Sequence, residues 1–240
     1  MQALDNIHSQ ALAHWNDLNI LQEKIVVSAK PLTPEEAIGK PDDQDYPIQQ
    51  GKEHLMEATF NGHKGQAFTD SRGTFSGTLA DIAALPMSSN FNRAVFVATL
   101  NAVGCAYDNT EHTVHCKDNE PKECAGNLRE YIKEKYGKRR ITIIGFQPAM
   151  TEALHAEFDV RLIDLDPNNI GQIKRGVLVE GKEKTQEAVE WAELLLVTGT
   201  TLANNSIDLF LTEKPVIFYG TTIAGAAPYM NWERFCPMSK

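Results

Sequence analysis

Short apolar segments alternate with helical segments through about the last hundred residues of the 240-residue chain, and this order restricts the possible folds most. The apolar segments are rich in Ile, Val and Leu, which is typical of strands buried on both faces of a parallel sheet. Strands that alternate with helices predict a parallel sheet with helices on both sides. The predicted strands are ITIIGF (141–146), DVRLIDLD (159–166), ELLLVTGTTL (193–202) and KPVIFYGTT (214–222). The predicted helices between them are PAMTEALHAEF (148–158), TQEAVEWA (185–192) and NSIDLFLTE (205–213).

Antiparallel strands followed by helices are predicted for the first half of the chain. HLMEATFNGHKGQAFTD (54–70) alternates around NGHKG, and Asn-Gly is typical of a hairpin turn, here lengthened by a few residues. KIVVSAK (24–30) predicts a further strand. Apolar residues at helical spacing predict helices, which span 3–22, 78–85 and 90–104.

The two patterns meet near Tyr136–Arg140, so we expect two domains. The predicted fold class is α/β, with an α+β domain over residues 1–136 and a Rossmann-like parallel α/β domain over residues 137–240. GKPDDQDYPIQQGKE (39–53) is a polar loop, which we interpret as a surface excursion or as a lid over a site.

Charge and composition argue against several classes of protein. The formal net charge of −9 disfavours nucleic-acid binding, which requires Lys and Arg to neutralise phosphates. The apolar runs are too short to span a bilayer and the N-terminus lacks signal-peptide character, so we expect a cytoplasmic protein without a membrane partner. Its cysteines, at positions 105, 116, 124 and 236, form no C-x-x-C pair and are expected to be reduced. A homodimer is possible, since symmetric dimers are the commonest soluble oligomers.

Gly, Thr, Asn and Asp collect directly after the predicted parallel strands. In an open parallel sheet, ligands bind beyond the carboxyl ends of the strands. These residue types allow close backbone approach and supply hydroxyls, amides and carboxylates, although Gly, Asn and Asp also simply form turns. We therefore expect a polar crevice there. Its segments are GFQPAM (145–150), DLDPNN (164–169), TGTTLANN (198–205) and YGTT (219–222).

Asp164 lies about twenty residues after the first strand, the place of the acid that binds ribose in dinucleotide-binding proteins. GFQPAM contains a single glycine, however, and lacks the G-x-G-x-x-G turn that a pyrophosphate requires. A nicotinamide dinucleotide is therefore disfavoured, and a nucleoside, a pterin or another flat ligand fits better. The cofactor, if one exists, is not identified by these motifs.

HCKDNEPKECA (115–125) precedes and begins a predicted helix. Asp118 or Asn119 can cap that helix, and Glu120 favours the positive end of its dipole. Lys117 stands before the helix, where a side chain can project into the crevice. Beside Asp118 and Glu120 it can serve as a charge-tuned acid or base, although a solvated lysine accounts for it equally.

A metal site is the alternative interpretation of the same stretch. His112, His115, Cys116 and Cys124 are metal-binding residue types within thirteen residues. Their spacing matches no common structural zinc motif, which favours ordinary thiols and histidines over a metal site. We expect His115 and Cys116 to face the crevice, with Lys117 the stronger candidate for function.

Several segments together resemble the putative heavy-metal chelation family, a group of proteins of unknown function. The resemblance runs from about residue 25 to about residue 228. It implies an N-terminal domain like the enolase N-terminal fold, a Rossmann-like second domain, and a site between them. The segments are KPLTPEEAIG, GQAFTD, HCKDNEPKECA, IGFQPAM, DLDPNNIG, VTGTTLANNSID and VIFYGTT.

Carried onto this chain, the resemblance implies a site at the linker helix and at four strand ends. Its catalytic candidates are Lys117, Asp118 and Glu120. Its ligand-binding candidates are Asn119, Gly145, Phe146, Gln147, Asp164, Asp166, Thr200, Thr201, Asn204, Gly220 and Thr221. Thr69 and Asp70 can reach in from the hairpin, although a surface pair of Asp70 with Arg72 is the simpler interpretation.

The resemblance and the crevice lead to two main functional hypotheses. The first is a protein that binds a small-molecule or metal-organic ligand without turnover. The alternative is an enzyme of condensation or hydrolysis on flavin-, pterin- or siderophore-like compounds, which predicts a perturbed pKa in the crevice. A structural or regulatory role would need a large exposed apolar patch, and no segment requires one.

Overall fold

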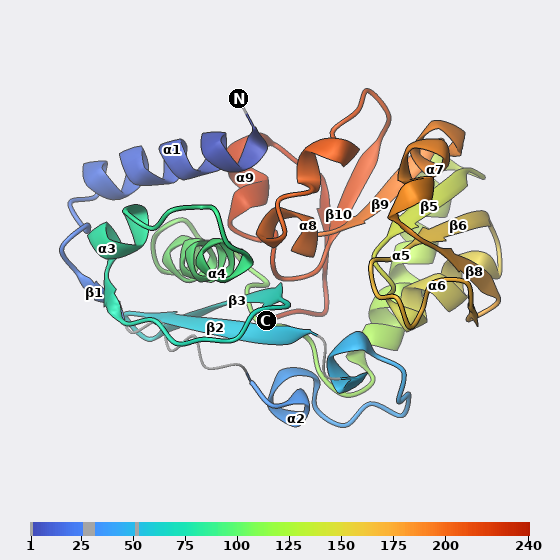
Figure 1. The fold of residues 1–240 in the computed structure, drawn as a ribbon, viewed down its shortest axis with the longest axis horizontal. Coiled ribbons are helices and arrows are strands. Elements are labelled where there is room, and N and C mark those ends of the chain that lie inside the picture. The colour runs from blue at the N-terminus through green and yellow to red at the C-terminus, as the bar shows by residue number, and fades with distance from the viewer. Residues whose placement is uncertain (1, 26–31, 51–52) are drawn as a thin grey trace.

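A seven-stranded sheet runs through the described part of the chain, and helices are arranged around it (Figure 1). The computed structural model describes residues 2–25, 32–50 and 53–240. The strands are β5 (Arg140–Ile144), β6 (Asp159–Ile163), β7 (Ile173–Lys174), β8 (Val177–Glu180), β9 (Leu194–Thr198), β10 (Val216–Tyr219) and β11 (Arg234–Phe235). In space their order is β11-β10-β9-β5-β6-β8-β7, and only β7 and β8 pair antiparallel. The α/β class predicted from the alternation of strands and helices is confirmed.

Helices bury both faces of this sheet, which is why its strands are apolar throughout. Ile141 and Ile143 point to one face and pack in a cluster with Leu128 of the helix α5. Ile144 points to the other face and packs in a second cluster with Ala188. The helices are α5 (Glu120–Tyr136), α6 (Pro148–His155), α7 (Thr185–Trp191) and α8 (Thr200–Ala203), with short 3-10 turns η2 (Lys182–Lys184) and η3 (Ile207–Phe210).

A long helix, α4 (Asn90–Tyr107), lies across an antiparallel hairpin in the N-terminal half (Figure 1). The hairpin strands are β2 (His54–Phe60) and β3 (His63–Thr69). The remaining elements are α1 (Ala3–Asp17), β1 (Lys24–Ile25), α2 (Pro34–Ile38), η1 (Pro47–Gln50), β4 (Gly77–Thr78), α3 (Leu79–Ala83) and α9 (Ala226–Met230). Within the described residues, none of the helices is both long and apolar enough to cross a bilayer.

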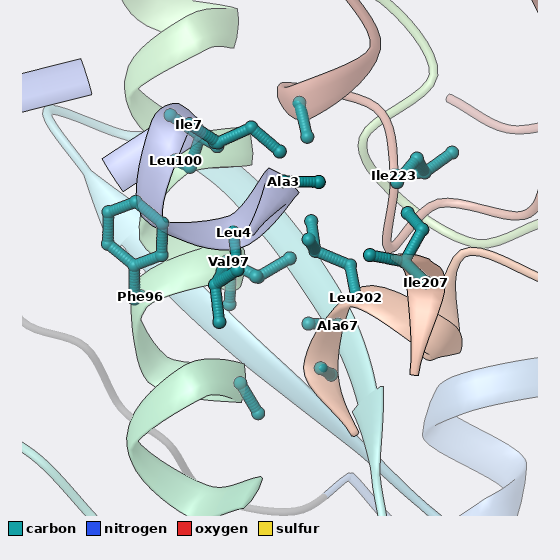
Figure 2. Packing of buried hydrophobic residues seen from close by; sticks show 14 of the residues in the cluster. Ala3, Leu4, Ile7, Ala67, Phe96, Val97, Leu100, Leu202, Ile207 and Ile223 are labelled. Carbon is teal, nitrogen blue, oxygen red and sulfur yellow. The ribbon is translucent and has the colours of Figure 1, made fainter. Parts of the chain in front are cut away.

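One apolar cluster joins the two halves of the chain. Figure 2 shows Leu4 and Ile7 of α1 beside Phe96 of α4, with Leu202 and Ile223 from the C-terminal half in the same cluster. The division at residue 136 stays a prediction. The packing of α5 and α6 against the sheet favours a boundary placed before α5.

Several predicted boundaries in the N-terminal half are wrong, and each has a local cause. The helix predicted over 3–22 ends at Asp17, because Asn19 adopts the left-handed conformation (φ 58°) that ends helices. The hairpin turn is not lengthened: Phe60 pairs with His63, which leaves a two-residue turn. The strand predicted at 24–30 is present as Lys24–Ile25, and its residues 26–30 lie outside the described residues.

Corrections in the C-terminal half concern short elements. The helix predicted over 205–213 is only the 3-10 turn η3, because the Asn204 side chain accepts hydrogen bonds from the backbone and hydroxyl of Ser206 and forms a turn there. The strand predicted over 159–166 ends at Ile163. The short strands β7, β8 and β11 were not predicted.

Gly65 of β3 allows the hairpin to approach the backbone of α4. A Cβ at this position would lie 2.2 Å from the Ala102 nitrogen and 2.3 Å from the Ala98 carbonyl oxygen. Gly65→Ala is therefore expected to lower the free energy of unfolding by about 2 kcal/mol, because backbone atoms cannot yield as a side chain can. Gly126→Ala on α5 is the matched control, since no atom lies within 4 Å of the added carbon there. Urea unfolding should show a gain of about 0.5–1 kcal/mol for the control, and equal values for the two variants would contradict this packing.

Candidate functional site

A cavity of about 110 Å³ lies at the carboxyl ends of β5, β6, β9 and β10, on the side facing the hairpin. We call it the strand-end cavity. This is several times the volume of about 10–15 Å³ that a single buried water requires. The C-terminal half lines it with Gly145, Phe146, Gln147, Met150, Asp164, Thr198, Thr200, Tyr219, Gly220, Thr222 and Cys236. The N-terminal half and the linker line it with Ile38, Tyr46, Pro47, Ile48, Glu53, Phe68, His115, Cys116, Pro121 and Cys124.

Hydrogen bonds hold the strand ends of the cavity in place. The buried Tyr219 hydroxyl at the end of β10 donates to the carbonyl of Gly145 at 2.8 Å and to that of Ile144 at 3.1 Å. Burial raises the pKa of Tyr219, so this phenol stays a proton donor. Gly220 has φ 92°, and no atom lies within 4 Å of the place where a Cβ would stand. The space beside the backbone after β10 is therefore open at Gly220.

Asp164 organises the loop after β6. One carboxylate oxygen accepts the backbone N–H of Phe146 at 2.7 Å, and the other accepts that of Asp166 at 2.7 Å. The carboxylate thus joins the ends of β5 and β6 while it lines the cavity. Asp166 in turn accepts the backbone N–H of Asn168 at 2.9 Å, so it shapes the loop and does not line the cavity.

Glu53 faces these carboxylates from the residue before β2. Its half-buried side chain lines the cavity, and no hydrogen bond or ion pair to another described residue satisfies its carboxyl group. Burial raises the pKa of Glu53 to about 7, and the negative charges of Asp164, Asp166 and Asp70 act in the same direction. Glu53 therefore changes charge near neutral pH, unlike an exposed glutamate.

Three thiols line the cavity together. Burial raises the pKa of Cys124 to about 12 and raises that of Cys116 as well, so both remain protonated thiols at neutral pH. The third thiol, of Cys236, is half-buried and contacts the Ser239 hydroxyl. The ring of His115 lies edge-on to Phe68, and burial lowers the pKa of His115, which keeps this side chain neutral.

The loop predicted as an excursion or lid covers part of the cavity. Tyr46 and Ile48 are buried and line it. Arg175, in the turn between β7 and β8, pairs with Asp45 at 2.6 Å and with Asp43 at 3.1 Å. The loop is thus fastened to the C-terminal half of the chain.

The catalytic candidates of HCKDNEPKECA lie outside the cavity lining. The Asp118 carboxylate accepts the backbone N–H of Lys40 at 2.8 Å, and Glu120 accepts that of Lys117 at 2.6 Å. Asn119 lies at the start of α5, and its side-chain oxygen is 3.4 Å from the Asp42 nitrogen. These contacts join the loop to α5, whereas the cavity is lined by His115 and Cys116 before them and by Pro121 and Cys124 after them. An acid–base role for Lys117, Asp118 or Glu120 stays a prediction.

The remaining predicted residues divide into two groups. Gly145, Phe146, Gln147, Asp164, Thr200 and Gly220 line the cavity. The others support the loops around it: Thr69 accepts the Ser71 N–H, Asp70 accepts the Asn90 amide, Thr201 donates to the Thr198 carbonyl, Asn204 accepts from Ser206, and the Thr221 carbonyl accepts the Asn101 amide.

Sequence reasoning missed several residues of the cavity, among them Glu53, Tyr46, Phe68 and Cys236. Glu53 and Tyr46 lie in a polar stretch whose composition indicates only a loop. Phe68 lies one residue before Thr69 on a strand that was predicted, so the alternation of β3 is the signal that could have located it.

The sheet order and the cavity define this chain as an α/β protein with a cavity at the carboxyl ends of its parallel strands. Residues 128–227 match the model of the DUF364 family, described as putative heavy-metal chelation. The resemblance predicted from the sequence is thereby borne out over these residues. A comparison with curated proteins finds no significant match.

Two crystal structures of DUF364 proteins of unknown function have a similar fold. One, from Pyrococcus horikoshii, is 13% identical with a TM-score of 0.57, and the alignment covers 92% of this chain and 80% of that one. The other, from Desulfitobacterium hafniense DCB-2, is 9% identical with a TM-score of 0.56, and the alignment covers 95% and 82% of the two chains. At these identities the similarity concerns the fold alone.

The family description raises the question of a metal ion. In the part of the chain that the structure describes, no group of three or more His, Cys, Asp or Glu side chains is placed to hold one. Both histidines that were considered as metal ligands have one ring nitrogen close to a backbone carbonyl. His112 Nδ1 lies 2.6 Å from the Ser239 carbonyl, and His115 Nδ1 lies 2.6 Å from the Cys116 carbonyl. The described residues therefore do not fit a directly bound metal ion.

Proposed function

We propose that the chain is a binding protein for a small organic ligand, which it holds in the strand-end cavity. The observation that carries the proposal is the meeting of Glu53 from the hairpin side with Asp164 at the strand ends, inside one cavity. A concave, largely apolar cavity with a few converging polar groups is the usual form of a ligand site.

The aromatic side chains in the walls of the cavity favour a flat ligand. Tyr46, Phe68, Phe146 and Tyr219 contribute aromatic rings from four separate segments. Aromatic side chains stack on planar molecules, while the strand-end backbone supplies hydrogen bonds in the plane. A heterocyclic compound without a pyrophosphate group agrees with both features.

Native mass spectrometry of the full chain, purified without added ligand, tests this proposal. Wild-type protein is expected to carry a small organic mass, which Asp164→Ala loses because the cavity loses a carboxylate and the Phe146 and Asp166 N–H groups lose their acceptor. Asp159→Ala is the matched control, since Asp159 is an exposed carboxylate at the opposite end of β6. The control should keep the mass. Equal retention by all three proteins, or an absent mass in the wild type together with no binding by any probe of the cavity, would contradict the proposal.

A second candidate function is an enzyme of condensation or hydrolysis acting on a flavin-, pterin- or siderophore-like compound. Glu53 favours it, because a cavity carboxyl group with a pKa of about 7 can donate or accept a proton near neutral pH. Incubation of the released compound with fresh protein distinguishes the two functions. Turnover that Glu53→Gln abolishes while binding persists supports an enzyme, and an unchanged compound supports a binding protein.

A further inference from the structure

We infer that the strand-end cavity selects a ligand with a positively charged or N–H-donating nitrogen group, such as an amidine, a guanidine or a protonated amine. This inference rests on the proposed function and names its ligand class. It is drawn from the charges that line the cavity and from the Glu53 carboxyl group, which accepts no hydrogen bond from another described residue.

The charges that line the cavity are negative. Glu53 and Asp164 contribute carboxyl groups, and the half-buried His115, whose pKa is lowered by burial, is neutral. Among the described residues, neither Lys nor Arg lines the cavity. A phosphate or carboxylate ligand would face Glu53 and Asp164 without a described counter-charge, at a large cost in desolvation and repulsion.

The two carboxyl groups of the cavity differ in the hydrogen bonds that they can still accept from a ligand. Asp164 already accepts a backbone N–H on each oxygen, and these two hydrogen bonds fix the position of its carboxylate. Glu53 accepts no hydrogen bond from another described residue, and its carboxylate can therefore receive two N–H groups from a ligand. A planar amidinium group presents two parallel N–H bonds, which match a carboxylate in a bidentate pair.

The aromatic walls of the cavity favour the same class of ligand. A delocalised cation on a planar framework is attracted to the faces of rings such as Tyr46 and Phe68 as well as to a carboxylate. A cation also relieves the repulsion among the carboxylates, so its binding draws the proton off Glu53. We therefore expect the affinity for a cation to rise as the pH increases through about 7.

Three matched probes test the inference: benzamidine, benzamide and benzoate. They share a planar ring and differ in the charge of one small group. Probes of about nine non-hydrogen atoms bind in the millimolar range or tighter when a cavity fits them. Titrations of the ¹⁵N-labelled full chain at about pH 8, where Glu53 is ionised, should shift the amide signals of Gly145 and Gly220, which line the cavity.

Benzamidine is expected to bind about tenfold more tightly than benzamide, and benzoate most weakly, because a charge-assisted pair contributes roughly this factor. Glu53→Gln should weaken benzamidine about tenfold and change benzamide by less than about threefold. Glu57→Gln is the control, since Glu57 on β2 is paired with Lys64 at 2.8 Å and does not line the cavity. Glu57→Gln should leave the order of the three probe affinities and the ratios between them unchanged.

Binding of benzoate at these amides as tightly as benzamidine would overturn the inference and leave the proposed function standing. An absence of any shift with benzamidine at millimolar concentration would overturn it equally. The proposed function is judged separately, by the organic mass that the wild type carries and Asp164→Ala loses. The failure of either claim is therefore recognisable without the other.

Discussion

Replacement of Asn101 by alanine is expected to lower the free energy of unfolding by about 4 kcal/mol. Asn101 is fully buried on α4 and connects three segments. Its amide donates to the Gln66 carbonyl at 2.8 Å and to the Thr221 carbonyl at 3.0 Å, and its oxygen accepts the Gly225 N–H at 2.6 Å. The substitution leaves the buried Gln66 carbonyl and Gly225 N–H without this partner, each at roughly 1–3 kcal/mol, whereas the Thr221 carbonyl keeps the Ala224 N–H at 3.0 Å.

Urea unfolding of Asn101→Ala and of Thr99→Val measures this effect against a matched control. Thr99 is also fully buried on α4, but its hydroxyl has no hydrogen-bond partner among the described residues. Valine replaces that hydroxyl by a methyl group of similar shape, so the control is expected to change stability by less than about 1 kcal/mol or to raise it. A small loss for Asn101→Ala, similar to the control, would show that the loop after β10 does not depend on this side chain.

The protein is expected to lose on the order of 3 kcal/mol of stability from Glu53 as the pH rises from about 4.5 to about 7. The unfolded chain releases this proton near 4.5, whereas the folded protein holds it until about 7. Between these values the folded state binds more protons than the unfolded state, so the free energy of unfolding falls with rising pH. The contribution is complete below the unfolded pKa and absent above the folded one.

Unfolding of the wild type and of Glu53→Gln in parallel, from about pH 4 to about pH 8, isolates this contribution because all other groups titrate in both proteins. Relative to the wild type, the variant should gain about 3 kcal/mol across that range, most of it between 4.5 and 7. Parallel stability curves would show that Glu53 titrates as an exposed carboxyl group. The cavity would then lack a group poised near neutral pH, and the enzyme hypothesis would lose its support.

Periodic segments of the sequence predicted the fold well, and short segments did not. The strands β5, β9 and β10 consist mainly of β-branched, aliphatic and aromatic residues, which suit burial on both faces of a parallel sheet. Two-residue strands such as β7 and β11 are too short to carry any period. Their pairing comes from the tertiary structure alone.

The candidate site also has residues that the sequence located and residues that it missed. Gly145, Asp164 and Gly220 were located because the ends of parallel strands meet at one edge of a sheet, a rule that needs only the order of the elements. Glu53 and Cys236 reach the cavity from segments far apart in the chain. No local pattern predicts such a meeting.

The sequence by itself determined the alternation of elements, the class of fold and the strand ends that line the cavity, because each depends on local period and composition. Only the tertiary structure decided that Lys117, Asp118 and Glu120 join a loop to α5 while Glu53 faces Asp164. The physical reason is that the charge state of a carboxyl group depends on burial and on neighbouring charges. Those neighbours are brought together by long-range packing and not by the order of residues.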